Sequence, residues 1–283
     1  MRQVLDLFKL RIGVAIALAA AAGLAVEQGA KTGFLEKILL IGAVLVASAA
    51  AGAFNQYVER DLDARMGRTR NRPFVTGRLR HGPAWLWLIG AMLAASVAAA
   101  ALAANPLAGL YVFLGAFTYG VVYTVWLKRR TWWNIVVGGL AGSFAVLAGA
   151  AAISPAPGPE AAALAVVLFL WTPPHFWSLA IACRDDYAAA GVPMLPVVVG
   201  DARAARAIFA GAWLMVGASL VPGLFSLGTV YLVSAAAGGT LFLLRCWALV
   251  QRPGRDTARA AFLASLLQLG AVLAGAMADV ALR

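Results

Sequence analysis

The sequence predicts an all-α protein, a polytopic membrane bundle of about nine transmembrane helices. Of its 283 residues, 63% are hydrophobic and only 12% are charged, far from the balance of water-soluble proteins. Apolar segments of about 20 residues, the length that crosses a bilayer as a helix, follow one another along the whole chain. These observations exclude a water-soluble fold.

Nine apolar segments separated by polar breaks are the predicted membrane spans. They are residues 11–27, 37–58, 84–104, 107–127, 132–152, 161–182, 207–226, 229–250 and 258–281. Most are rich in Ala and Gly, and small residues let transmembrane helices approach closely. The longest stretch without a span, Glu59 to Gly82, has 24 residues, fewer than the roughly 40 that an independent domain needs. We therefore expect residues 1–283 to form one transmembrane domain.

The basic residues fall mainly on one side of the predicted membrane. Of the 23 Lys and Arg residues, 20 lie before the first span or after the second, fourth, sixth and eighth spans. The positive-inside rule then places the N-terminus in the cytoplasm and the C-terminus outside. This distribution explains the net charge of +11 without nucleic acid, because no soluble binding module accompanies the charge.

The first cluster of acidic residues follows the second span, in the segment NQYVERDLDARMG from Asn55 to Gly67. If the helix continues, Asn55, Glu59 and Asp63 recur every four residues and share one face, whereas Asp61 points elsewhere. Amide and carboxylate oxygens are ligands that Mg²⁺ prefers. Simple ion pairing at the interface is the alternative, but acids inserted in a long apolar helix favour a functional site.

The second cluster follows the sixth span and contains WTPPHFW and, further on, Arg184-Asp185-Asp186-Tyr187. His175 and Asp186 are eleven residues apart, a spacing that returns to nearly the same helix face, so we expect both to face one cavity. The paired prolines fall near mid-membrane and interrupt backbone hydrogen bonds, which neighbours or water must satisfy, so we expect the bundle to be open there. His175 is either a functional group or a core histidine bonded to a carbonyl.

Basic residues accompany both acidic clusters. The Arg-rich segment between residues 65 and 80, together with Lys128, Arg129 and Arg130 after the fourth span, can bind phosphate oxygens. A diphosphate bridged by metal ions is the ligand that this combination favours, although each basic residue can also serve only as a topology anchor.

Four segments resemble the UbiA superfamily of membrane prenyltransferases, and within it the heme-modifying branch. They are NQYVERDLDARMGRTRNRP (55–73), YTVWLKRRTWWNIVVGG (123–139), WTPPHFWSLAIACRDDY (171–187) and GVPMLPVV (191–198). The resemblance implies a UbiA-like fold, a bacterial inner-membrane location, and Mg²⁺-dependent transfer of a farnesyl group from farnesyl diphosphate to a vinyl carbon of heme b. It also implies a place in heme biosynthesis for terminal oxidases, with a heme A synthase or oxidase assembly as a possible partner.

The resemblance assigns roles to individual residues of this sequence. Asp63, Asp186 and Lys128 are expected to be catalytic. The metal ligands would be Asn55, Glu59, Asp63, Asp185 and Asp186. The diphosphate would be held by Arg68, Arg72, Tyr123, Lys128 and Arg129. His175 would contact the heme.

Two other functions stay open from the sequence alone. A UbiA-type enzyme can use a quinone precursor or a chlorophyll-like ring as its acceptor. An ion-coupled transporter also places acids inside the membrane, but the concentration of both acidic clusters on one side favours the enzyme.

Overall fold

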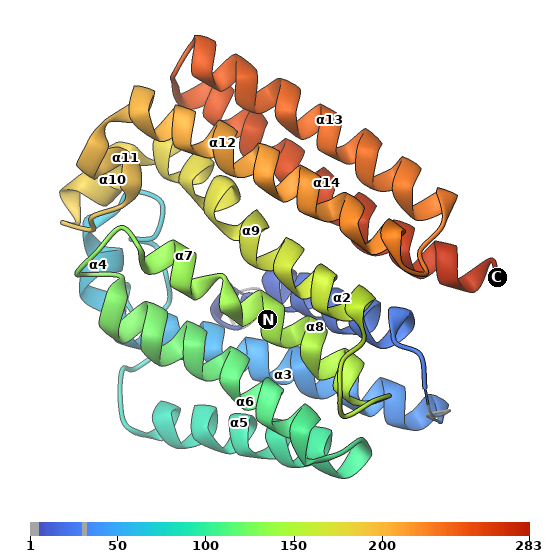
Figure 1. Cartoon of the computed structure of the whole chain (residues 1–283). Coiled ribbons are helices and arrows are strands. Elements are labelled where there is room, and N and C mark those ends of the chain that lie inside the picture. Colours follow the sequence, from blue (N-terminus) through green and yellow to red (C-terminus); the bar gives the residue numbers. More distant parts are fainter. Residues whose placement is uncertain (1–5, 30–32) are drawn as a thin grey trace.

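The computed structural model describes residues 6–29 and 33–283, and these residues form an all-helical bundle without a strand (Figure 1). The predicted cytoplasmic start, residues 1–5, lies outside the described part. The long helices are α2 (Leu10–Val26), α3 (Phe34–Val58), α5 (Ala84–Ala103), α6 (Pro106–Phe117) continued by η1 (Thr118–Leu127), α7 (Asn134–Gly138) with α8 (Leu140–Ala151), α9 (Pro159–Ala182), α12 (Asp201–Leu220), α13 (Thr229–Gln251) and α14 (Arg255–Ala281). Short helices are α4 (Arg60–Arg65), α10 (Arg184–Ala189), α11 (Leu195–Val199) and η2 (Val221–Leu224).

The observed helices confirm the predicted fold class. Within the described residues, eight helices are long and apolar enough to cross a membrane, and the shorter apolar helix α2 supplies a ninth. Each begins and ends within six residues of its predicted span. Hydropathy is sufficient to predict these helices, because backbone N–H and C=O groups in lipid have no water to bond. A helix satisfies them with hydrogen bonds within the segment itself.

Glycines allow α2 and α8 to touch backbone to backbone in the centre of the bundle. A Cβ atom on Gly23 would lie 2.1 Å from the carbonyl oxygen of Val146, and one on Gly149 would lie 1.9 Å from that of Ala20. No side chain fits at either position. The close contact is the small-residue packing that replaces the hydrophobic effect between helices in lipid.

Helix α9 passes through its two prolines, as the predicted span 161–182 does. Pro173 and Pro174 both lie inside the helix, and Pro174 is buried. Gly211 of α12 packs against the Pro174 ring. The predicted opening is therefore filled at Pro174 by a neighbouring helix. Nearby, the Thr172 hydroxyl donates to the carbonyl oxygen of Leu168.

The helix that begins as α6 changes to π-helical winding over Thr118–Leu127. Its wider turn ends with a hydrogen bond from the backbone N–H of Lys128 to the carbonyl oxygen of Tyr123, five residues earlier, at 2.9 Å. Such segments are rare and frequently lie at functional sites. This one ends next to the first acidic segment, because Lys128 reaches Glu59.

Candidate active site

The first acidic segment keeps three polar side chains on one buried face. The N–H of Glu59 donates to the carbonyl of Asn55 at 3.0 Å, and that of Asp63 donates to the carbonyl of Glu59 at 2.8 Å. Helical bonding therefore continues from α3 into α4 through a bend at Glu59. Asn55, Glu59 and Asp63 are each no more than 2% exposed. The side chain of Asp61 is 52% exposed and points elsewhere, as the spacing predicted.

Each buried polar group on this face has a cationic partner. Lys128 Nζ lies 2.6 Å from both carboxylate oxygens of Glu59 and donates a hydrogen bond to Oε2. Arg72 Nη1 lies 2.7 and 2.6 Å from the two oxygens of Asp63. Lys9 Nζ donates to Asn55 Oδ1 at 2.6 Å. Three cations therefore converge on one helix face.

The second acidic segment meets the first at the same end of the bundle, which we call the polar end. Asp186 accepts hydrogen bonds from the backbone N–H groups of Gly67 at 2.9 Å and Arg68 at 3.3 Å. The Arg68 guanidinium lies 6.0 Å from the centre of the Tyr187 ring. Burial lowers the pKa of Arg68, but the Tyr187 phenol, the Cys183 thiol and nearby carboxylates together raise it above its ordinary value. Asp185 is exposed.

Arg129, a predicted diphosphate residue, lies on the outer side of this cluster. Its guanidinium donates to both oxygens of Asp61 at 2.9 and 2.7 Å. The hydrogen bonds lower the pKa of Asp61 and raise that of Arg129. Both side chains are more than 40% exposed, so this pair contributes little to stability.

Three residues near Asn55 had no chemical signal in the sequence. Lys9 Nζ also donates to the hydroxyl of Tyr119 at 3.1 Å, and Asn55 Nδ2 donates to Thr124 Oγ1 at 3.0 Å. Burial, with the nearby charge of Arg72, lowers the pKa of Lys9 from 10.5 to about 7. A lysine just before an apolar span is expected to be a topology anchor. The hydroxyls of Tyr119 and Thr124 lie within an apolar span. Only the fold brings them together.

The oxygen donors suit a hard cation such as Mg²⁺ in their chemistry. Within the described residues, however, no three His, Cys, Asp or Glu side chains lie close enough together to hold a metal ion. The carboxylates of Glu59 and Asp63 are paired with cations, while that of Asp186 is bound by peptide N–H groups. Glu59 Oε1 accepts no hydrogen bond, and its contact is the ion pair with Lys128 Nζ at 2.6 Å. The donor set fits a metal once an anion shares the surrounding cations.

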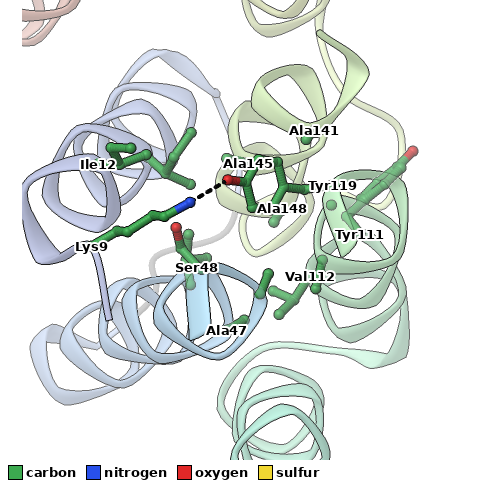
Figure 2. A pocket seen from close by; sticks show the side chains of 16 residues that line it. Lys9, Ile12, Ala47, Ser48, Tyr111, Val112, Tyr119, Ala141, Ala145 and Ala148 are labelled. Atoms are coloured by element: carbon green, nitrogen blue, oxygen red, sulfur yellow. Dashed lines mark hydrogen bonds between the residues drawn. The ribbon is translucent and has the colours of Figure 1, made fainter. Parts of the chain in front are cut away.

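An apolar cavity of about 90 Å³ begins beside this cluster and continues into the bundle (Figure 2). Lys9 and Tyr119 lie at the polar end of the cavity, and Val44 and Tyr111 lie deeper, about 12 Å along the axis at 1.5 Å per helical residue. Small residues of α3, α6 and α8 form most of the wall. Ser48 also lines the cavity, and its hydroxyl has no hydrogen-bond partner among the described residues.

His175 and Asp186 do not face one cavity, so that expectation is wrong. Cys183 ends α9 with φ −121° and ψ 28°, which changes the chain direction before α10. The His175 ring is stacked between Trp171 and Phe262, with centroid distances of 4.0 and 4.5 Å. Its Nδ1 lies 2.6 Å from Ser265 Oγ. At 5% exposure it is a packed core residue, and this geometry does not support the predicted heme contact.

Comparisons with known proteins agree with this geometry. Residues 15–269 match the UbiA prenyltransferase family. The chain is 57% identical to protoheme IX farnesyltransferase 2 of Paramagnetospirillum magneticum over 97% of this chain and 95% of the relative. It is 46% identical to protoheme IX farnesyltransferase 1 of the same organism over 98% of both chains.

Solved structures share the fold at low identity. A structure of digeranylgeranylglyceryl phosphate synthase superposes with a TM-score of 0.77 at 17% identity, covering 98% of both chains. A UbiA homolog from Archaeoglobus fulgidus bound to DMAPP and Mg²⁺ superposes with a TM-score of 0.72 at 18% identity, covering 99% of this chain and 100% of that one.

Proposed function

Because the chain belongs to the UbiA prenyltransferase family, we propose that it transfers a farnesyl group from farnesyl diphosphate to a vinyl group of protoheme IX, giving heme O. One observation carries this proposal. Two acidic segments and three buried or half-buried cations meet above an apolar cavity, in a chain 57% identical to a protoheme IX farnesyltransferase. The product would be used in heme A and heme O synthesis for terminal oxidases.

The cations of the polar end would hold the diphosphate of the donor. Arg68, Arg72 and Lys128 lie next to the acidic face, and Tyr123 lies under the Lys128 ammonium, 5.6 Å from ring centre to Nζ. Lys9 adds a further cation at the cavity mouth. Arg129 would take part only after release from Asp61.

Asn55, Glu59, Asp63, Asp185 and Asp186 are the residues that would bind Mg²⁺. When bound, the metal would supply positive charge for the leaving diphosphate. The binding of a Mg²⁺ diphosphate would let Glu59 and Asp63 exchange part of their ion pairing with Lys128 and Arg72 for the metal. The same two cations would then face the phosphate oxygens.

The residues of the site would favour breaking of the allylic C–O bond. That step places negative charge on the diphosphate and positive charge on the isoprenoid. Lys128, Arg72 and Arg68 are held in position before the reaction, so they would stabilise the departing charge without reorganisation. The apolar walls on the other side would exclude water from the farnesyl cation until the vinyl group attacks it. Water would then add to the cation left on the former vinyl group and lose a proton, which gives the hydroxyethylfarnesyl side chain of heme O.

The farnesyl chain would lie in the cavity of Figure 2. Each buried CH₂ contributes about 0.8 kcal/mol to membrane partitioning, so the tail is stable inside the bundle while its head stays at the polar end. We further propose that the polar end faces the cytoplasm of a bacterial inner membrane, because the basic loops gather there. A heme A synthase or oxidase assembly would receive the product.

Purified protein in detergent with heme b, farnesyl diphosphate and Mg²⁺ tests the proposal. We expect chromatography to show a more hydrophobic heme together with released pyrophosphate, and we expect EDTA to stop both until Mg²⁺ is restored. An unchanged heme, under conditions where a known protoheme IX farnesyltransferase works, would remove the acceptor assignment. Pyrophosphate release with a quinone precursor instead would assign that acceptor.

A further inference from the structure

A second cavity lies between α3, α5 and the α6–η1 helix and opens toward the membrane. Its volume is about 280 Å³. The residues of α5 that line it lie between Leu86 and Leu93, and those of α6 and η1 lie between Phe113 and Val121. These are the halves of the two helices farthest from Asn105, where they join. We call this space the α3–α5–α6 groove; α5 and α6 lie at the lower edge of Figure 1.

The walls of the groove suit a flat apolar molecule that arrives from the lipid. Phe54, Phe113 and Phe117 present aromatic rings along it, and aromatic rings pack well against other planar ring systems. Leu86 is 42% exposed and Phe117 is 40% exposed on the outer surface of the bundle. In a membrane-spanning chain this surface contacts lipid, so a ligand can enter sideways.

The groove adjoins the cavity assigned to the farnesyl chain. Ala51 of α3 and Ala116 of α6 line both spaces. Their side chains are single methyl groups, and Ala51 lies one helical turn before Asn55 on α3. The winding of the same helix changes to π-helical at Thr118, two residues beyond Ala116. The boundary between the two spaces is therefore thin where the donor's reacting carbon would lie.

The polar end of the groove carries unpaired basic residues. Leu79, Trp85 and Phe54 pack against the buried apolar cluster that contains Ile89. Phe54 and Ile89 also line the groove. Leu79 lies between Arg78 and Arg80 in the sequence. Both arginines are exposed, and neither makes a hydrogen bond or an ion pair within residues 6–29 and 33–283. They are available for a carboxylate.

We propose that the α3–α5–α6 groove is the docking site of the heme acceptor, a planar macrocycle with apolar faces, carboxylates on one edge and vinyl groups on the opposite edge. The inference rests on the proposed function. The propionates would pair with Arg78 and Arg80, and the vinyl edge would point down the groove to Ala51 and Ala116. Charge and shape therefore orient the ring with its reactive edge toward the donor.

Filling the groove is the first test. A Cβ atom on Gly90, which lines the groove, meets nothing within 4 Å, so this position accepts a side chain and Gly90→Leu narrows the groove. Gly217→Leu on α12 is the matched control, because Gly217 is exposed and also has open space around it. Binding is followed by the fluorescence of zinc protoporphyrin IX, with protein-free micelles as the blank, and by the KM values for heme b and farnesyl diphosphate.

We expect Gly90→Leu to weaken porphyrin binding about tenfold, a loss of about 1.4 kcal/mol, and to raise the KM for heme b alone. Gly217→Leu should match the wild type. Wild-type porphyrin affinity in Gly90→Leu would overturn the proposal, whatever the activity. If Gly90→Leu loses porphyrin binding but the wild type does not farnesylate heme b, the docking site stands and the proposed function fails.

Removing the charges is the second test. Arg78→Gln combined with Arg80→Gln should weaken binding of zinc protoporphyrin IX but leave binding of its dimethyl ester unchanged, because the ester has no carboxylates to pair. Equal weakening for acid and ester, or no weakening of either, would show that these arginines do not recognise the propionates and would overturn the proposed orientation.

Discussion

Lys128 Nζ lies 2.6 Å from the carboxylate of Glu59, and both residues are buried although 69 positions separate them in the chain. The pair joins the π-helical η1 to the end of α3. It therefore couples the stability of the bundle to the placement of a predicted catalytic cation.

Lys128→Met should destabilise the protein by about 3–5 kcal/mol, because it leaves the Glu59 carboxylate buried and unpaired. Glu59→Gln combined with Lys128→Met should recover most of that loss, since no charge remains unpaired. Thermal unfolding in detergent measures both effects. The double variant should still be inactive, and farnesyl transfer at the wild-type rate would contradict the role of the pair in catalysis.

Asp186→Asn should lower turnover at least a hundredfold while the unfolding temperature changes little. The amide oxygen of Asn can still accept the hydrogen bond from Gly67 but carries no charge for a metal. Asp256→Asn is the control, because Asp256 is an exposed acid in the first turn of α14. A wild-type rate in Asp186→Asn would separate Asp186 from catalysis.

Ser48→Leu should shift the donor preference toward a shorter chain. Ser48 lines the middle of the donor cavity, so a larger side chain shortens the space below it. Competition between geranyl and farnesyl diphosphate measures the preference. An unchanged ratio would place the farnesyl tail elsewhere.

In metal-free protein, Lys9 should make stability rise with pH. Its folded pKa, about 7, lies below the ordinary value of 10.5, so the unfolded chain binds more protons between these values and deprotonation favours the fold. The destabilisation that results from burying the Lys9 charge is fully present below pH 7. Unfolding temperatures from pH 6.5 to 10 with a chelator measure this. The unfolding temperature of Lys9→Met should rise less over that range. Parallel curves for the variant and the wild type would refute the assignment of the pH dependence to Lys9.

The sequence was sufficient to predict the spans and the Asn55–Glu59–Asp63 face, because hydropathy and helical spacing are local properties. It was not sufficient for the closed packing at Pro174, since Gly211, 37 residues later, supplies the contact there. Lys9 was missed for the same reason. Its partners Asn55 and Tyr119 are 46 and 110 positions away, and no local pattern encodes such a contact.

The backbone contact between α2 and α8 at Gly23 and Gly149 bears on how inhibitor resistance would arise. Both helices wall the donor cavity, and a residue larger than glycine at either position would collide with the opposing carbonyl group. This side of the cavity cannot change shape by mutation at those glycines without separating the helices. Resistance to a compound bound in the cavity would therefore have to arise at residues that line the cavity itself, such as Ser48 of α3.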